Sequence, residues 1–192
     1  MNASWLAASA TVCATVLAAL FAYINTNRVH QAQERLKWIN AQLGEFYGPL
    51  YSIALAGEVA WKQFRIQVRP EGGYLFDYDL TEDEKREWTR WMSTVIMPAN
   101  RRMYEIIVTK SHLLVGDEMP PLFLRFCAHV ASYEVLIKNW EQNDYSIINS
   151  QIKFPQGYRE QISETFLSLK RQQQDLLQRV EPSRRRRLRS SK

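Results

Sequence analysis

Hydrophobic and polar positions divide the chain into one continuous apolar stretch followed by a long series of amphipathic segments. The apolar stretch runs from Ala3 to Ile24 and contains no Asp, Glu, Lys or Arg. It is long enough for a helix to cross the hydrocarbon core of a bilayer, which takes about 20 residues. Trp5 and Tyr23 stand near its two ends, where spanning helices carry interfacial aromatic residues. The pattern predicts a single transmembrane anchor over residues 1–27.

A heptad-type stripe follows the anchor without a break. Apolar residues recur at alternating spacings of three and four, which is the pattern of a helix with one apolar seam. These residues are Val29, Ala32, Leu36, Ile39, Leu43 and Phe46. We expect the membrane helix to continue into the cytosol as a stalk and to be interrupted at Gly48-Pro49, because proline lacks the backbone donor and clashes with the preceding turn.

The remaining chain shows further helical spacing between clear breaks. The segments lie at about 50–67, 81–96, 98–114, 121–140 and 158–180. The loop at 69–79 separates the first two, and the polar connection at 141–157 separates the last two. Thr81-x-x-Glu84 has the form of a capping box at a helix start. No alternating β-branched pattern occurs. We therefore predict an all-α protein in which residues 28–181 form a cytosolic antiparallel bundle of about five or six helices.

The last predicted helix carries a second heptad stripe, interrupted by the polar Gln173. A polar residue on such a seam can fix the register or the number of partners. We expect this seam to pack against the stalk within one chain, and pairing between chains is the alternative.

Charge is concentrated at the C-terminus. The formal net charge is +5, and the last ten residues carry +6, which leaves the rest of the chain at −1. Residues 182–192 are expected to form a disordered polybasic tail. Its arginines are the candidate contacts to anionic lipid or another polyanion, because basic residues near an anionic leaflet bind it. They are Arg184, Arg185, Arg186, Arg187 and Arg189. A solvated tail without a ligand is the alternative, and the anchor disfavours nucleic acid as a partner.

Flanking charges predict the orientation of the anchor. No basic residue precedes it, whereas Arg28, Arg35 and Lys37 follow it, so the N-terminus is expected outside and the body in the cytosol, which in bacteria means the inner membrane. A cleaved signal peptide is the competing interpretation. It is disfavoured because the segment has no basic n-region, and because Leu20 stands where cleavage after Ala22 requires a small residue.

Small residues recur along one face of the anchor. Ala10, Ala14, Ala18 and Ala22 are spaced by four, which lets two membrane helices approach closely. This face is a candidate for homo-oligomerisation through the transmembrane helix, although any alanine-rich span produces such spacing by chance.

The search for catalytic and metal-binding motifs gives no assignment. The chain has no glycine-rich phosphate loop, no His-Glu-x-x-His and no Cys-x-x-Cys. His112 and His129 lie on different predicted helices, but neither has a carboxylate at metal-binding spacing. The Asp77-x-Asp79 sequence fails as a calcium loop, because position six is Glu82 rather than Gly. We expect no cofactor and no metal.

These observations favour a membrane-anchored helical interaction module, such as an adaptor, sensor or assembly factor, with the lipid bilayer and an unknown protein as partners. An oligomerising effector that disrupts membranes is one alternative. An enzyme with an unrecognised site between helices is the other, since bundles can hold sites that no spacing reveals.

Overall fold

The computed structural model describes the backbone of residues 3–68 and 80–190 and the side chains of residues 12–68 and 80–179. These residues form helices and irregular connections without a strand, which confirms the all-α prediction. The elements are α1 (Ala3–Ala41), η1 (Gln42–Tyr47), α2 (Gly48–Val68), α3 (Glu82–Trp91), η2 (Met92–Ile96), α4 (Met97–Thr109), η3 (Ser111–Leu113), α5 (Pro121–Glu141) and α6 (Tyr158–Ser190). The chain divides into two compact units, residues 41–169 and residues 1–40 with 170–192. The predicted loop at 69–79 lies outside the described residues.

The bundle contains about four helices, so the prediction of five or six is wrong. The chain stays helical at two prolines where the sequence predicts a break, Pro49 and Pro98. As a result η1 leads directly into α2, and α3 continues through η2 into α4. Each pair of predicted helices is therefore one helix with a local irregularity.

A π-helical turn precedes each of these prolines and explains why the helix survives. In η1 the Gly48 N–H donates to the Leu43 carbonyl, and in η2 the Met97 N–H donates to the Met92 carbonyl. Both bonds span five residues instead of four. The extra residue widens the turn just where a proline ring collides with the backbone of an ordinary α-helix.

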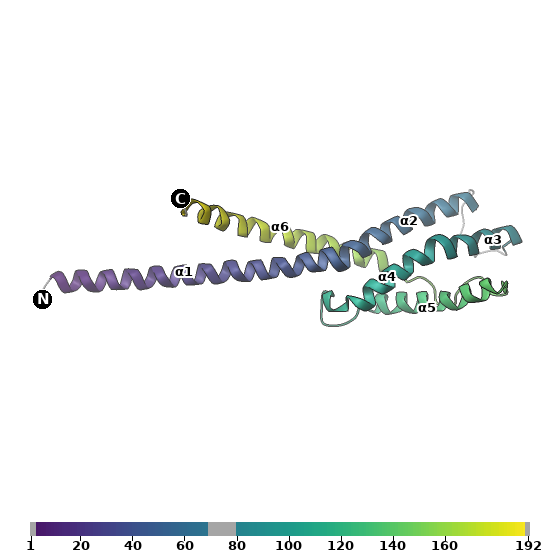
Figure 1. Cartoon of the computed structure of the whole chain (residues 1–192), viewed down its shortest axis with the longest axis horizontal. Helices are drawn as coiled ribbons and strands as arrows, with labels where there is room; N and C mark the ends of the chain where they lie inside the picture. The colour runs from purple at the N-terminus through teal and green to yellow at the C-terminus, as the bar shows by residue number, and fades with distance from the viewer. Residues whose placement is uncertain (1–2, 69–79, 191–192) are drawn as a thin grey trace. The chain divides into compact units, whose positions relative to one another are not determined.

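Within residues 41–169 the helices lie side by side and alternate in direction (Figure 1). Helix α2 packs against α3 and α4, and α4 packs against α5. The core between them is rich in aromatic and sulfur-containing side chains. Its most fully buried members are Phe46, Leu50, Phe64, Met92, Met97, Ile107, Phe123, Phe126, Tyr158 and Ile162. These residues come from η1, α2, η2, α4, α5 and α6, which shows that these elements share one core.

The capping box predicted at the start of α3 is confirmed. The Thr81 hydroxyl accepts from the Glu84 backbone N–H (3.3 Å), and the Thr81 N–H donates to the Glu84 carboxylate (2.8 Å). Two donors that the helix cannot satisfy internally are thereby bonded. Glu82 and Asp83 in the first turn place negative charge at the positive end of the helix dipole.

Thr81→Ala should lower the free energy of unfolding of the bundle by about 1 kcal/mol, because the Glu84 N–H loses its acceptor. Urea denaturation of the full chain in a mild detergent, followed by tryptophan fluorescence, measures the change. Thr81→Ser keeps the hydroxyl and should stay close to the parent protein. An equal loss in both variants would show that the methyl group of Thr81, rather than the cap, is responsible.

The other unit contains most of α1 and the C-terminal part of α6. The helix over Val12–Val68 is long and apolar enough near the N-terminus to span a membrane, and none of its apolar window is buried. Within this unit the Gln173 amide donates to the Asn40 Oδ1 (2.7 Å), so the polar residue of the last helix contacts α1 of the same chain. Helix α6 extends to Ser190 and so continues past Pro182, where the sequence predicts the helix to end.

Candidate functional site

The bundle encloses an open cavity of about 800 Å³, within the range of small-molecule sites. Its walls come from α2, the α3–α4 helix, α5, the connection at 142–157 and the start of α6. The α2 wall is built from small residues, which leave the space that larger side chains would fill. They are Ala54, Ala56, Gly57 and Ala60.

Aromatic side chains close one end of this cavity. Trp61 from α2 and Trp88 from α3 line it, with their ring centroids 5.9 Å apart in an edge-to-face arrangement. Phe64 packs behind both, at 5.6 Å and 5.7 Å. Met92 and Val95 continue the apolar wall along the same helix. The two rings and this wall give the tryptophan end of the cavity a mainly apolar surface.

Basic side chains gather at the other end. Arg102 and Arg159 both line the cavity, and each is the chain neighbour of a residue in a contacting pair. Arg102 precedes Met103 and Arg159 follows Tyr158, and the Tyr158 hydroxyl lies 3.9 Å from the Met103 sulfur. Lys153 is the third basic residue of the lining, and no Asp or Glu belongs to it among the described residues. Trp88 and Arg102 are 14 positions apart, which corresponds to roughly 21 Å of helix.

The irregular connection between α5 and α6 is fixed by side-chain hydrogen bonds. Trp88 Nε1 donates to the Ile148 carbonyl (2.7 Å), and the Tyr133 hydroxyl donates to Asn149 Oδ1 (2.5 Å). Further along, the Arg159 guanidinium lies over the Phe154 ring, 5.2 Å from its centroid. The connection thus forms a defined wall of the cavity although it has no regular secondary structure.

His129 is the one histidine in the described cavity lining, and it is buried. Its Nδ1 lies 2.6 Å from the Ile152 carbonyl, which can only accept, so Nδ1 carries the proton and Nε2 has a free lone pair. Burial lowers the pKa of the imidazole, and the bond to Ile152 opposes this in part. Tyr133 and Phe154 hold the ring edge-on at 4.9 Å and 5.6 Å. The neutral imidazole thus keeps one ring nitrogen, Nε2, that can accept a hydrogen bond.

The lowered pKa of His129 predicts a pH-dependent stability. The unfolded chain takes up a proton as the pH falls through 6.5, whereas the folded chain does not until a lower pH. The stability is therefore complete above pH 6.5 and decreases below it, with a slope of at most about 1.4 kcal/mol per pH unit. Denaturation at about pH 7.5 and about pH 5.5 measures the difference, which His129→Gln should reduce. His112→Gln is the exposed control, and it should behave like the parent.

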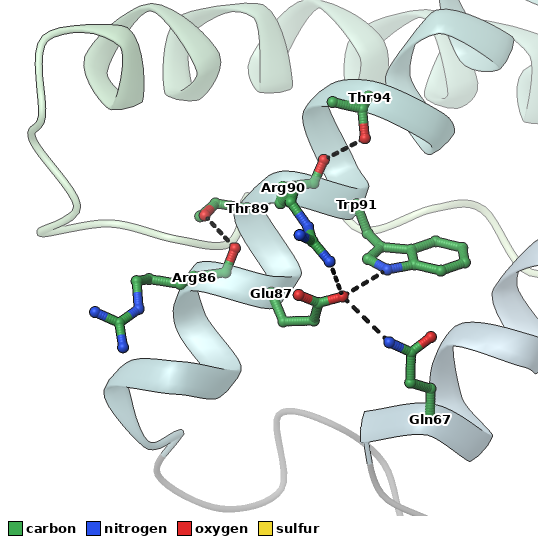
Figure 2. A network of polar contacts seen from close by, with 7 residues as sticks. All are labelled: Gln67, Arg86, Glu87, Thr89, Arg90, Trp91 and Thr94. Carbon is green, nitrogen blue, oxygen red and sulfur yellow. Dashed lines mark hydrogen bonds and ion pairs between the residues drawn. The ribbon is translucent and has the colours of Figure 1, made fainter.

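Glu87 joins α2 to α3 beside the aromatic end of the cavity. One carboxylate oxygen accepts from Trp91 Nε1 (2.9 Å), from Arg90 (2.9 Å) and from the Gln67 amide at the end of α2 (3.4 Å), as Figure 2 shows. Trp91 in turn packs against Phe64 at 5.3 Å. This network fixes the helix pair that carries Trp61 and Trp88.

The alanines and arginines that the sequence singled out as candidate site residues are not part of the described cavity lining. Ala14, Ala18 and Ala22 are exposed on α1, whereas the side chain of Ala10 lies outside the described residues. The side chains of the five tail arginines, Arg184 to Arg187 and Arg189, lie outside them as well. Self-association and lipid contact at these positions therefore stay predictions.

Sequence reasoning also considered the histidines and cysteines. His112 is exposed in η3, while His129 is buried between α5 and the following connection, so the two have different surroundings. Cys13 and Cys127 are both free thiols, and burial raises the pKa of Cys127. Within the part of the chain that the structure describes, no three His, Cys, Asp or Glu side chains form a metal-binding group.

No protein-family model, curated protein sequence or solved structure shows significant similarity to this chain.

Proposed function

We propose that this protein is a single-pass membrane protein whose cytosolic helical bundle is a binding module without a reaction of its own. The observation that carries the proposal is the uncovered apolar part of α1. Val16, Leu20 and Phe21 are 52%, 52% and 70% exposed, and such a continuous apolar surface requires a cover. A bilayer provides that cover for a helix of this length.

The flanking charges support the orientation. Arg28, Arg35 and Lys37 follow the apolar stretch and no basic residue precedes it, so the positive-inside rule places the N-terminus outside and the bundle in the cytosol. In a bacterium the membrane concerned is the inner membrane. The polybasic tail is then close to the inner leaflet, where each arginine contributes about 1 kcal/mol of attraction to anionic lipid.

The bundle supports the binding role. It has a core of its own, and its cavity combines an apolar wall with a few polar groups that converge on one end, which is the usual composition of a ligand site. The irregular wall of this cavity is held by hydrogen bonds from Trp88, His129 and Tyr133. A site fixed in this way is ordered before its ligand arrives, which lowers the entropic cost of binding.

Membrane fractionation tests the proposal. The full-length chain should stay with the membrane after a high-salt wash and be protected from protease added outside, whereas a chain that starts at Asn27 should be soluble. Release of the full-length chain by salt, or a mature protein that lacks its first segment and is found outside, would overturn the anchor and its orientation together.

A further inference from the structure

We infer that the cavity of the bundle binds one single-chain anionic lipid, with its head group at Arg102 and Arg159 and its chain directed toward Trp61 and Trp88. The inference deepens the proposed function, since it names the ligand of the binding module. It is carried by a cavity whose described lining combines three basic side chains and no carboxylate with an apolar helix wall that ends at two tryptophans.

The charge of the lining selects the head group. Arg102, Lys153 and Arg159 line the cavity, and none of the three makes an ion pair with a carboxylate of the described residues. This contrasts with Arg101, the neighbour of Arg102, which makes a bidentate contact with Glu134 at 2.6 Å and 2.9 Å. Arg102 is exposed and Arg159 is half-buried, so both can reach a ligand. Two lining arginines without a carboxylate partner among the described residues suit a carboxylate or a phosphate, which arginine binds through charge-assisted hydrogen bonds.

The shape and the surface of the lining select the rest of the ligand. The wall from Met103 past Val95 and Met92 to Trp88 is apolar except for Arg102 itself and Asn100, over the roughly 21 Å of helix between Trp88 and Arg102. A long acyl chain matches an apolar surface of this length. A compact anion such as a nucleotide would leave the aromatic end unfilled, and a neutral chain would leave the two arginines unpaired.

Gly57 offers a way to close the cavity without breaking the fold. A Cβ added at this position meets no atom within 4 Å, so a larger side chain can extend into the open space beside α2. Replacing a helical glycine also favours the helix. Gly57→Leu should therefore fold at least as well as the parent and occupy the space that the acyl chain needs.

The experiment titrates the full-length protein in phosphatidylcholine nanodiscs with palmitate brominated near its methyl end, and follows tryptophan fluorescence. Bromine quenches a tryptophan on contact, so a chain that reaches Trp61 and Trp88 gives saturable quenching. The Gly57→Leu variant measures the background quenching by probe dissolved in the bilayer, and it should show no saturable quenching. Arg102→Gln with Arg159→Gln should weaken binding by roughly tenfold or more.

Matched controls separate the site from general charge attraction. Arg125→Gln with Lys138→Gln removes the same number of charges from exposed positions of α5 outside the cavity, and should bind the probe as the parent does. Palmitoyl lysophosphatidic acid should compete with the probe, and palmityl alcohol should not. Competition by both unbrominated palmitate and palmitoyl lysophosphatidic acid supports anionic lipids in general. Competition by palmitate alone restricts the head group to a carboxylate.

Three results would overturn the inference. The first is quenching that is identical in the parent and in Gly57→Leu, and the second is competition by palmityl alcohol equal to that by palmitoyl lysophosphatidic acid. The third is binding of an acidic amphipathic peptide without binding of palmitate, which would assign the cavity to a protein partner. Failure of lipid binding in a protein that fractionates with the membrane leaves the anchored module standing. Lipid binding by a protein that does not stay in the membrane removes the anchor alone.

Discussion

Phe126→Ala should lower the free energy of unfolding of the bundle by about 3–5 kcal/mol, the range expected when a buried phenylalanine is truncated. Phe126 is completely buried. Its ring stacks on Tyr158 with centroids 4.4 Å apart and meets Phe154 edge-on at 5.7 Å. The truncation therefore removes two aromatic contacts and leaves a cavity that the helices α5 and α6 cannot close without moving.

Urea denaturation of the full chain in detergent measures this loss, because four of the six tryptophans lie in the bundle and report its unfolding. Leu124→Ala is the matched control on the same helix. Leu124 is 57% exposed, so its truncation should change the stability by less than about 0.5 kcal/mol. Similar losses in both variants would show that Phe126 is not part of a packed core.

The same truncation connects stability to the candidate site. Phe154 and His129 line the cavity, and Phe126 supports Phe154 from the core side. A looser Phe154 also affects Arg159, whose guanidinium lies on its ring. The variant should consequently bind the brominated probe more weakly even under conditions where it remains folded.

The helices and the cap could be predicted because their causes are local. Thr81 and Glu84 are three residues apart, so the capping box depends on four positions of sequence. The apolar stretch of α1 is likewise visible as an uninterrupted run. Proline was misjudged for the opposite reason. Whether Pro49 or Pro98 ends a helix depends on the π turn before it, and the residue types in η1 and η2 do not predict that turn.

The candidate site was invisible in the sequence because it depends on which helix faces which. Arg102, Lys153 and Arg159 have no common spacing, and they come together only when α4, α6 and the intervening connection are folded. One signal was present. Ala56 and Ala60 lie on the apolar face of a predicted helix, and small residues at such positions leave room beside it.

Glu87 shows the same limit for polar residues. In the sequence it follows Glu82, Asp83 and Glu84, and such a run of acidic residues is typical of a helix N-terminus. In the folded chain its carboxylate accepts from Gln67 of another helix and from Trp91 (Figure 2). A polar residue becomes a structural link only through its partners, and sequence spacing does not identify partners that lie 20 positions away.

Gly48→Ala should destabilise the bundle by about 2–3 kcal/mol, the cost of forcing an atom into a packed site. A Cβ at this position would lie 2.3 Å from the Leu43 carbonyl oxygen and 3.5 Å from its carbon. The Leu43 carbonyl is the acceptor of the π-turn bond from Gly48, and backbone cannot move aside as a flexible side chain does. The added methyl group therefore either breaks this bond or displaces Pro49 and the start of α2.

Gly57→Ala is the matched control, because both changes are glycine to alanine in one continuous helical stretch and restrict the unfolded chain equally. At Gly57 the new Cβ meets nothing, so the gain in helix propensity should raise the stability by about 0.5–1 kcal/mol. The two variants should thus shift the urea midpoint in opposite directions. Equal shifts of the urea midpoint would mean that the π turn relaxes around an alanine. The close approach at Gly48 would then not explain why the helix continues through Pro49.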